Sequence, residues 1–430
     1  MKAVIIAGGK GTRIAEIYPD IPKPMIPIDG VPVLEREIAC LRQQGIVDIM
    51  VTVQYKAEAI MNYFGDGSKF GVHIEYYLEK EPLGNAGALF RIRSLLDDDF
   101  LLLNADSIFD INLERFLTFH KKSGGLATIV VHPNDHPFDS GLISCNEAGC
   151  VKSWIPKEAA RDKYYRNLVN AGIHILSPDI LDVPVNKEKI DLDRDILMPL
   201  VSSGVLYAYK TPEYVKDMGT PERLQQVESD FQKGIVSARN LRNKQKAIFL
   251  DRDGTINKYV GFLRDEKEFE LLEGVPEAIK IFHALGYLVI VVTNQPVVAR
   301  GEVTVQKLER IHMKMETLLG QQGAYIDGLY YCPHHPDSGF DGEIKSLKID
   351  CECRKPKPGM LLQVAKDFNI DLQLSWMVGD SEADVEAGKR AGCRTCYIGK
   401  NMSVECDEKF DSVYEFACMW GELKGLFKTV

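Results

Sequence analysis

The residues best suited to chemistry begin in the second half of the 430-residue chain, where the apolar run KAIFL leads into Asp251-Arg252-Asp253-Gly254-Thr255. Two carboxylates separated by one residue at the end of a predicted strand stand where α/β folds place their ligands. An aspartate can attack phosphorus and form an aspartyl-phosphate, which divides hydrolysis into two easier steps. A second acid can protonate the leaving oxygen and then activate water. The segment therefore predicts phosphoryl chemistry.

Three later segments supply the other groups that phosphoryl transfer needs. The predicted strand LVIVV ends in Thr293 and Asn294, whose hydroxyl and amide suit a phosphate oxygen. Lys355 offers a cation for the charge on the transferring phosphoryl group. Asp380 follows the strand-like run WMVG and could hold Mg²⁺, which prefers oxygen ligands. The first segment alone could be a solvated turn, but the ordered set favours an enzyme site.

A loop rich in cysteine and histidine predicts a metal centre of another kind. Cys332-Pro333-His334-His335 is followed, after a polar loop, by Cys351-Glu352-Cys353. Three thiols and one imidazole match a closed structural zinc site. The expected ligands are Cys332, His334, Cys351 and Cys353, with His335 as the alternative imidazole. Because Arg354 and Lys355 directly follow the last thiol, Zn²⁺ is expected to fix the loop that presents the phosphate-binding cation and not to perform the chemistry.

The first half of the chain carries a second set of candidate residues. A glycine-rich turn over Ala7–Arg13 follows an apolar run, and its backbone NH groups could approach phosphates, although it has neither Walker nor Rossmann spacing. Lys23 stands between two prolines, which hold a cation in a stiff, extended segment. Asp106 ends the run LLLNA, and Asp217 occurs farther on. Each feature alone is a weak signal, but two separated carboxylates could clamp Mg²⁺ on a nucleoside triphosphate.

Strands must position these groups. Short β-rich runs alternate with longer amphipathic segments along the whole chain, and this pattern predicts the α/β class with parallel sheets covered by helices. The expected strands are Ala3–Ala7, Ile49–Val53, Leu101–Leu103, Ala247–Leu250, Leu288–Val292 and Trp376–Val378. A polar, strongly charged stretch after Gln225 separates two such series. We therefore expect a first domain over 1–232, a flexible or semi-rigid linker over 233–245 and a second domain over 246–430.

Composition and charge limit the functional class. With 45% hydrophobic and 27% charged residues, the chain is typical of a globular protein, and its length favours two domains. The formal net charge of -10 offers no basic field to a nucleic-acid backbone, so no nucleic-acid partner is expected. No apolar run approaches the roughly 20 residues of a spanning helix, and the start does not resemble a secretory signal. We expect no membrane partner and a cytoplasmic location; a homo-oligomer is left open.

The motifs DRDGT, TNQ, CPHH and C-x-C-R-K-P resemble the haloacid dehalogenase superfamily from Lys246 to about Ile398. Within it they resemble the D,D-heptose 1,7-bisphosphate 7-phosphatases and, more distantly, the histidinol-phosphate phosphatases. The resemblance implies a cap-less, doubly wound parallel sheet with a zinc loop. It implies Asp251 as nucleophile, Asp253 as acid/base, Thr293, Asn294, Gln295, Arg354 and Lys355 as phosphate or substrate contacts, and Mg²⁺ held by Asp251, Asp253 (through its carbonyl) and Asp380.

The motifs of the first half resemble the sugar-1-phosphate nucleotidyltransferases over roughly Met1 to Val227. The resemblance implies a Rossmann-like sheet. It implies triphosphate ligands at Gly8, Gly9, Gly11, Arg13 and Lys23, base and sugar contacts at Glu81, Gly84 and Asn85, an Mg²⁺ pair at Asp106 and Asp217, and sugar contacts at Gly141, Asn170 and Gly172.

The two resemblances together imply consecutive reactions. A Mg²⁺-dependent 7-phosphatase acting on D-glycero-D-manno-heptose 1,7-bisphosphate through an aspartyl-phosphate would leave heptose 1-phosphate. The first domain would then transfer a nucleotidyl group from GTP to D-glycero-α-D-manno-heptose 1-phosphate, giving GDP-heptose and pyrophosphate. The alternative is a mannose- or glucose-1-phosphate nucleotidyltransferase joined to a phosphatase of another specificity, such as one resembling the histidinol-phosphate enzymes. A non-catalytic half is disfavoured, because neither half lacks a carboxylate that its chemistry requires.

Overall fold

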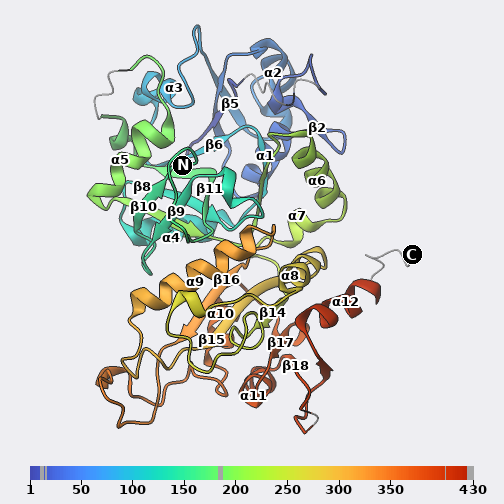
Figure 1. Ribbon diagram of the computed structural model, residues 1–430. Coiled ribbons are helices and arrows are strands. Elements are labelled where there is room, and N and C mark those ends of the chain that lie inside the picture. Colours follow the sequence, from blue (N-terminus) through green and yellow to red (C-terminus); the bar gives the residue numbers. More distant parts are fainter. Residues whose placement is uncertain (10–13, 15–16, 183–186, 402, 424–430) are drawn as a thin grey trace. The chain divides into compact units, whose positions relative to one another are not determined.

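The computed structural model describes residues 1–9, 14, 17–182, 187–401 and 403–423 (Figure 1). Its contacts divide the chain into two units. The first unit comprises Met1–His132, Ile143–Trp154 and Asn170–Asn240, and the second comprises Pro133–Leu142, Ile155–Val169 and Leu241–Val430. The last division falls inside the stretch expected to be a linker, where α7 (Ile235–Ala238) forms. Two short segments from the first half thus belong to the second unit, which the sequence did not predict.

The first unit is built on a nine-stranded mixed sheet. Its parallel part is β6 (Phe100–Asn104), β1 (Ala3–Ile6), β4 (Asp48–Val53) and β5 (His73–Leu78), in that order. The other strands are β8 (Ala127–His132), β9 (Leu142–Cys145), β10 (Val151–Ile155), β11 (Val169–Leu176) and β12 (Leu206–Lys210). The α/β class is confirmed, but β11 pairs antiparallel with β6, so this sheet is not purely parallel as expected. Antiparallel neighbours need no helical crossover, and an irregular segment leads into β11.

Helices pack on this sheet, whose central strands are nearly continuous apolar runs. Ile5 of β1 and Leu103 of β6 lie in one core with the inner faces of three helices. These are α1 (Val33–Gln43), α2 (Ala57–Phe64) and α4 (Leu113–Ser123). The first unit also contains α3 (Gly87–Arg91), α5 (Met198–Ser203), α6 (Pro221–Gln232), β2 (Pro27–Ile28) and β3 (Val31–Pro32). A separate two-stranded sheet pairs β7 (Ser107–Asp110) with β13 (Tyr214–Asp217), which sets Asp217 opposite Ser107.

The second unit contains a six-stranded parallel sheet in the order β16-β15-β14-β17-β18-β19. The strands are β14 (Ala247–Leu250), β15 (Leu288–Asn294), β16 (Gly328–Cys332), β17 (Trp376–Gly379), β18 (Arg394–Ile398) and β19 (Glu408–Phe410). The helices are α8 (Val275–Ala284), α9 (Val305–Gly320), α10 (Gly359–Asp367), α11 (Glu382–Ala391) and α12 (Val413–Leu423).

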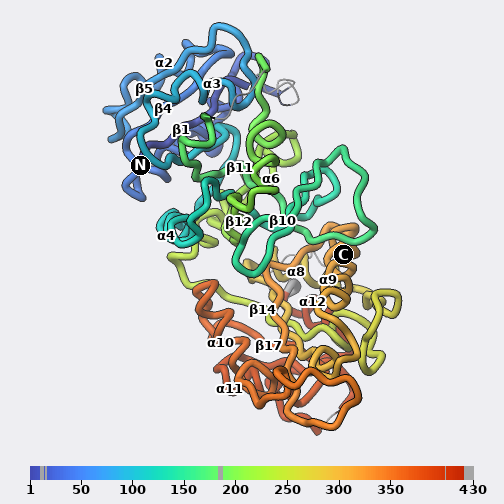
Figure 2. Tube along the Cα trace, turned by 90° about the vertical axis from the view of Figure 1, so that its left-hand side faces the viewer, coloured from blue at the N-terminus to red at the C-terminus, as the bar shows by residue number. Residues whose placement is uncertain are grey.

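Both faces of this second sheet are buried. Ile248 and Leu250 of β14 pack with α8, α9 and α12, whereas Ala247 and Phe249 pack with α10 and α11. Figure 2 shows the two groups of helices on opposite sides of β14 and β17. Strands covered on both faces have continuous apolar sequences, which explains the run KAIFL. The expected doubly wound parallel sheet is confirmed.

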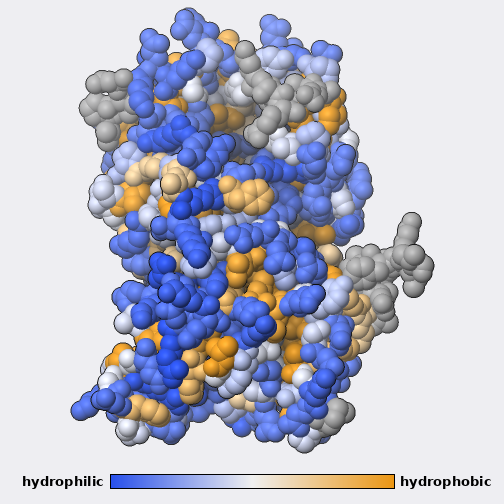
Figure 3. Space-filling model, viewed as in Figure 1, coloured by the Kyte–Doolittle hydropathy of each residue, from blue (hydrophilic) through white to orange (hydrophobic). Residues whose placement is uncertain are grey.

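Within the described part of the chain, no helix combines the length and the apolar character needed to cross a bilayer. On the face shown in Figure 3, hydrophilic residues cover most of the surface and hydrophobic residues form smaller patches. This distribution is expected where most large apolar side chains lie in the cores.

Candidate active sites

The carboxyl ends of three parallel strands meet at one edge of the second sheet. Asp251 directly follows β14, Thr293 and Asn294 end β15, and Asp380 directly follows β17. They line a cavity of about 180 Å³. The other polar side chains that line it include Asp253, Gln295, Arg354, Lys355, Ser381 and Asp384. The structure therefore brings together all the phosphatase residues that the sequence predicted, apart from the zinc loop cysteines and histidine, which form their own cluster.

Lys355 is the central charge of this cavity. Its Nζ lies 2.6 Å from Asp251 Oδ1 and 2.5 Å from Asp384 Oδ1, and its side chain is only 2% exposed. Burial alone would lower the pKa of Lys355, but the two carboxylates outweigh it and raise this pKa above its usual range. Asn294 fixes the loop, because its side chain accepts from the Lys355 NH at 3.1 Å and donates to the Lys355 carbonyl at 2.9 Å. Lys355 is thus a buried, charged group that is held in place at the cavity.

Three carboxylates crowd together beside this lysine. Asp251, Asp380 and Asp384 offer oxygen atoms within 4.8 Å of one another. Burial raises the pKa of Asp251 above its usual range, although Lys355 opposes the shift; burial, reinforced by Asp384, raises the pKa of Asp380 to about 6. Hard oxygen donors that repel one another suit a divalent cation such as Mg²⁺. Gly254 leaves room for the Asp380 side chain, since its φ is +87° and an added Cβ would lie 1.9 Å from Asp380 Oδ2.

Asp253 is held in one orientation by three neighbours. The Arg252 guanidinium donates to it at 2.7 Å, Gln295 at 2.8 Å and Asn257 at 3.0 Å. Burial alone would raise the pKa of Asp253, but Arg252 and these hydrogen bonds outweigh it and lower this pKa. Asp253 is therefore ionised in the free protein and must take up a proton before it can act as an acid. Arg252 and Asn257 were not predicted, although both lie in or beside the DRDGT motif.

The cysteine- and histidine-rich loop forms a separate cluster. Its four donors are Cys332, His334, Cys351 and Cys353. The sulfur atoms lie 3.2–3.5 Å apart, and His334 Nδ1 lies 3.3 Å from Cys353 Sγ. Such a set of soft donors fits a structural metal ion. His335 lies outside the cluster, because its Nδ1 accepts from a backbone NH at 3.1 Å. Arg354 donates to the His334 carbonyl at 3.3 Å, which ties the cluster to the phosphatase cavity.

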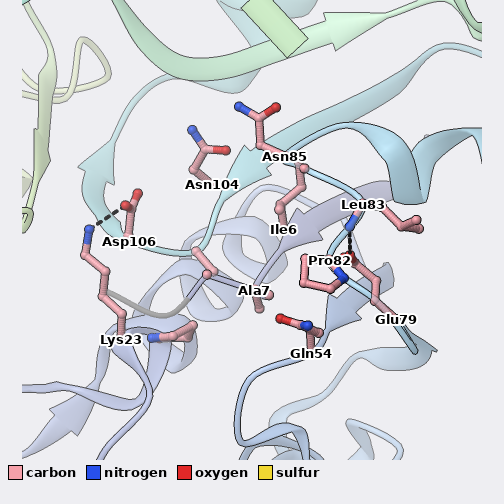
Figure 4. A pocket seen from close by; sticks show the side chains of 15 residues that line it. Ile6, Ala7, Lys23, Gln54, Glu79, Pro82, Leu83, Asn85, Asn104 and Asp106 are labelled. Carbon is pink, nitrogen blue, oxygen red and sulfur yellow. Dashed lines mark hydrogen bonds and ion pairs between the residues drawn. The ribbon is translucent and has the colours of Figure 1, made fainter. Parts of the chain in front are cut away.

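A second cavity, of about 460 Å³, lies at the carboxyl ends of β1 and β6 in the first unit. Figure 4 shows Lys23 and Asp106 on one side of it and Gln54, Glu79 and Leu83 on the other. The predicted residues that line it are Gly8, Gly9, Lys23, Gly84, Asn85 and Asp106. Gly11 and Arg13, also predicted as triphosphate ligands, lie outside the described residues. A lysine, a carboxylate and exposed glycine backbone together suit a nucleoside triphosphate and its cation.

The two carboxylates predicted to hold Mg²⁺ in this unit are each paired with a cation. Lys23 Nζ lies 2.5 Å from Asp106 Oδ2, and Arg223 lies 2.9 Å from Asp217 Oδ2. Burial alone would raise the pKa of Asp217, but Arg223 and the Gly219 NH outweigh it and lower this pKa. The Met218 NH donates to the Asp106 carbonyl at 3.0 Å, which brings the two acidic segments side by side.

Some predicted transferase residues do not line the cavity. Glu81 is exposed, and the buried Glu79 lies at the cavity instead, where it accepts from the Leu83 NH at 3.2 Å. Burial raises the pKa of Glu79. Gln54 also lines the cavity without having been predicted, since a glutamine after a strand carries no distinctive signal.

The predicted sugar-binding residues fall into two places. Gly172 of β11 has a φ of +73°, and an added Cβ would lie 2.8 Å from Asn104, which lines the cavity. Asn170 accepts from the Gly172 NH at 3.1 Å and donates to Asp193 at 3.2 Å. These residues therefore lie next to the cavity wall. Gly141, by contrast, belongs to a segment of the second unit.

Comparison with known proteins accounts for both halves. A nucleotidyl transferase family matches residues 2–234, and a haloacid dehalogenase-like hydrolase family matches residues 199–392. The D-glycero-beta-D-manno-heptose-1,7-bisphosphate 7-phosphatase of Pasteurella multocida (strain Pm70) is 44% identical over 156 residues, which are 36% of this chain and 82% of that protein. The chain belongs to both families, one after the other. It is a nucleotidyltransferase fused to a phosphatase, as expected.

Two further relatives match the first half. The UTP–glucose-1-phosphate uridylyltransferase of Synechocystis sp. is 34% identical over 261 residues, which are 57% of this chain and 66% of that protein. The crystal structure of HddC from Yersinia pseudotuberculosis is 28% identical with a TM-score of 0.47, and the match covers 54% of this chain and 99% of that one.

Asp193 gives the first unit a pH-dependent stability. Burial raises the pKa of Asp193 to about 6, and Asp191 adds to the shift. When burial raises the pKa of a carboxyl in the folded state, its ionisation lowers the free energy of unfolding. The stability therefore falls as pH rises from about 4 through about 6. Asp193→Asn keeps an acceptor for Asn170 and should raise the free energy of unfolding by about 1 kcal/mol at pH 8, with little change at pH 4. Thermal unfolding at both pH values measures this; the exposed Asp98→Asn is the control, and an equal gain at both values would contradict the assignment.

Proposed function

We propose that the second unit removes the 7-phosphate from a heptose 1,7-bisphosphate and that the first unit transfers a nucleotidyl group to the resulting heptose 1-phosphate. The observation that carries the proposal is the buried cluster of Asp251, Lys355 and Asp384 at the strand ends, in a region 44% identical to a heptose-1,7-bisphosphate 7-phosphatase. The fusion supports it, because the product of one reaction is the acceptor of the other. The nucleoside triphosphate is a cytoplasmic metabolite, which supports a cytoplasmic location.

In the phosphatase reaction, Asp251 would attack the phosphorus of the 7-phosphate while the bond from phosphorus to the sugar oxygen breaks. Lys355 and Thr293 would hold the phosphoryl oxygens, and Asp253 would give the leaving oxygen its proton. Bound by Asp251, the Asp253 carbonyl and Asp380, Mg²⁺ would neutralise charge on the phosphoryl group. In the second step, Asp253 would take a proton from the water that attacks the aspartyl-phosphate, which releases inorganic phosphate and restores Asp251.

In the transferase reaction, an oxygen of the sugar 1-phosphate would attack the α-phosphorus of the nucleoside triphosphate, and pyrophosphate would leave. Lys23 and the NH groups of Gly8 and Gly9 would bind the triphosphate. Asp106 and Asp217 would hold Mg²⁺, which neutralises the charge on the phosphates. GTP is the proposed donor, on the resemblance and the acceptor chemistry.

Substitution of the nucleophile Asp251 is the most direct test of this proposal. Asp251→Asn removes the attacking oxygen, so phosphate release should fall by about 10³-fold or more while pyrophosphate release from nucleotide and sugar phosphate continues. Asp106→Asn should give the reverse result. Separate phosphate and pyrophosphate assays on the full chain measure both reactions. Survival of both activities in Asp251→Asn would show that the site assignment is wrong.

The substrates are tested by product analysis. The two anomers of heptose 1,7-bisphosphate are offered separately, each with one of the four nucleoside triphosphates in turn. The protein should release phosphate, and it should form a nucleotide sugar when GTP is the donor. A second candidate, a hexose-1-phosphate nucleotidyltransferase joined to a phosphatase of another specificity, is favoured by the 34% identity to a glucose-1-phosphate uridylyltransferase. Product from glucose 1-phosphate and UTP, with none from the heptose, would decide for that candidate.

We propose Zn²⁺ for the cluster of three cysteines and one histidine. Cys353→Ser should remove about one equivalent of zinc, measured by elemental analysis, because one of four ligands is lost. Phosphate release should fall about tenfold as the loop carrying Arg354 and Lys355 loosens, while nucleotidyl transfer persists. His335→Asn and Cys145→Ser, both outside the cluster, should keep the zinc. Full zinc content in Cys353→Ser, or loss of zinc in His335→Asn, would refute this ligand set.

A further inference from the structure

A short segment of the first unit holds two side chains of the expected transferase site. We call it the brace segment; it comprises residues 190–195 and runs into the π-helix Leu192–Leu197. It belongs to the same unit as the residues that line the transferase cavity of about 460 Å³. Asp191 fixes its shape, because the Asp191 side chain accepts from the Arg194 NH at 2.9 Å and the Asp191 NH donates to Asp195 Oδ2 at 2.9 Å.

The brace segment is bound through its backbone to a turn that lines this cavity. The Ile190 NH donates to the Leu83 carbonyl at 2.9 Å, and the Ala86 NH donates to the Ile190 carbonyl at 3.1 Å. The two stretches of chain lie so close that an added Cβ at Gly84 would lie 2.3 Å from the Ile190 carbonyl oxygen. The position of the brace segment is therefore fixed relative to the cavity wall.

The brace segment also sets the orientation of a side chain in the cavity. The Leu192 NH donates to Asn85 Oδ1 at 2.8 Å. Because a backbone NH can only donate, the oxygen end of the Asn85 amide faces the brace segment, and its nitrogen end is left for other acceptors. Asn85 lines the cavity (Figure 4). An amide turned in this way offers donors, which suit the oxygen atoms of a nucleotide or a sugar.

Asn170 on β11 is turned in the same sense by two donors. Its Oδ1 accepts from the Gly172 NH at 3.1 Å, which identifies the oxygen end of this amide. His174 Nε2 lies 3.1 Å from the same oxygen, so this ring nitrogen carries the proton. Burial lowers the pKa of His174 to about 3, so the ring is neutral and His174 Nδ1 is a bare acceptor near neutral pH.

Asp193 of the brace segment binds the nitrogen end of the same amide. Asn170 Nδ2 donates to Asp193 Oδ1 at 3.2 Å. An ionised carboxylate has acceptors only, so it cannot bind the oxygen end of Asn170. Three groups thus hold this amide in one orientation. Only one of its two N–H groups is used by Asp193, and among the described residues the other has no hydrogen-bond partner although Asn170 is only partly buried.

Asn170 lies at the wall of the transferase cavity. It is hydrogen-bonded to Gly172, and an added Cβ at Gly172 would lie 2.8 Å from Asn104 Nδ2. Asn104 itself lines the cavity (Figure 4). The remaining N–H of Asn170 is thus a donor at this wall. Precise placement of such a donor has large effects on rate and affinity.

We propose that Asp193 and His174 are positioning residues that make Asn170 a hydrogen-bond donor to the sugar phosphate. The group that it binds is an oxygen with a free lone pair, from a hydroxyl or from the phosphate. An ammonium group in the same place would find no acceptor. The inference deepens the proposed function of the first unit and rests on it for the identity of the sugar phosphate. Neither Asp193 nor His174 was predicted from the sequence.

Steady-state kinetics of the full chain test the role of Asp193. Asp193→Leu removes the acceptor and lets the Asn170 amide rotate, so the KM for heptose 1-phosphate should rise about fivefold to tenfold. The KM for the nucleoside triphosphate should stay within about twofold, because the brace segment binds the turn through its backbone. Asp193→Asn keeps an oxygen that accepts and should stay within about twofold for both substrates. The exposed Asp98→Leu is the matched control and should change nothing.

His174 supplies a second, independent pair of variants. His174→Phe removes the donor to Asn170 Oδ1 but keeps a ring, and it should raise the KM for heptose 1-phosphate about threefold to fivefold. His174→Gln keeps a donor and should raise it less. This pair decides the matter if Asp193→Leu does not fold. An unchanged KM for the sugar phosphate in the variants that fold, a rise in Asp193→Asn as large as in Asp193→Leu, or equal rises in both KM values overturns the positioning role.

Hydrogen exchange of the side-chain amide, followed by NMR, is independent of activity. The Asn170 signal is assigned by its loss in Asn170→Asp. One of its two protons should exchange slowly in wild type and in Asp193→Asn, and fast in Asp193→Leu. Equal exchange in wild type and Asp193→Leu would overturn the proposed orientation. A wild-type chain that forms no nucleotide sugar refutes the proposed function instead, and amide exchange then decides the orientation alone.

Discussion

A buried ammonium group between two buried carboxylates is the interaction on which the phosphatase half depends. Lys355 Nζ lies within 2.6 Å of both Asp251 and Asp384, and a charge so deeply buried is tolerable only with partners on both sides. The strand ends supply Asp251, α11 supplies Asp384, and the cysteine-rich loop delivers the lysine. If the loop shifted, the two buried carboxylates would lose the cation that they share. The arrangement is therefore rigid before a substrate arrives, as phosphoryl transfer requires.

The same pairing recurs, less deeply buried, in the first unit. Lys23 and Asp106 form an ion pair at 2.5 Å, with side chains 14% and 35% exposed. In both cavities a lysine is paired with a carboxylate that is expected to bind a cation. Under the proposed function, a phosphate that binds together with Mg²⁺ would give each member of the pair a new partner. The Lys23 side chain is more exposed than that of Lys355, at 14% against 2%.

The sequence revealed the parts of the sites that follow buried strands. Asp251, Thr293 and Asp380 could be predicted because parallel strands covered on both faces are continuous apolar runs, and ligands gather where such runs end. Asp384 lies in the acidic segment after β17, but the sequence did not single it out as the second partner of Lys355, because that contact joins residues far apart in the chain. Glu79 was missed in favour of Glu81, since the choice depends on which carboxylate points inward, and the sequence of an irregular turn does not encode that direction.

The antiparallel course of β11 and the packing of Pro133–Leu142 and Ile155–Val169 within the second unit could not be predicted, because both depend on contacts between residues far apart in the chain. Arg166 meets Glu309 and Glu316 only in the folded chain, and a lone arginine in a polar loop is ordinarily a solvated surface residue. The consequence concerns domain boundaries. A domain normally has its own core and few contacts across its borders, and a cut within 233–245 satisfies that rule for the sheets. It would nevertheless separate Arg166 from Glu309 and Glu316, with which it forms ion pairs, and Pro137 from Gly320, against which it packs. The polar stretch after Gln225 therefore marks where one sheet ends and the next begins, whereas two segments that precede it in the sequence pack within the second unit.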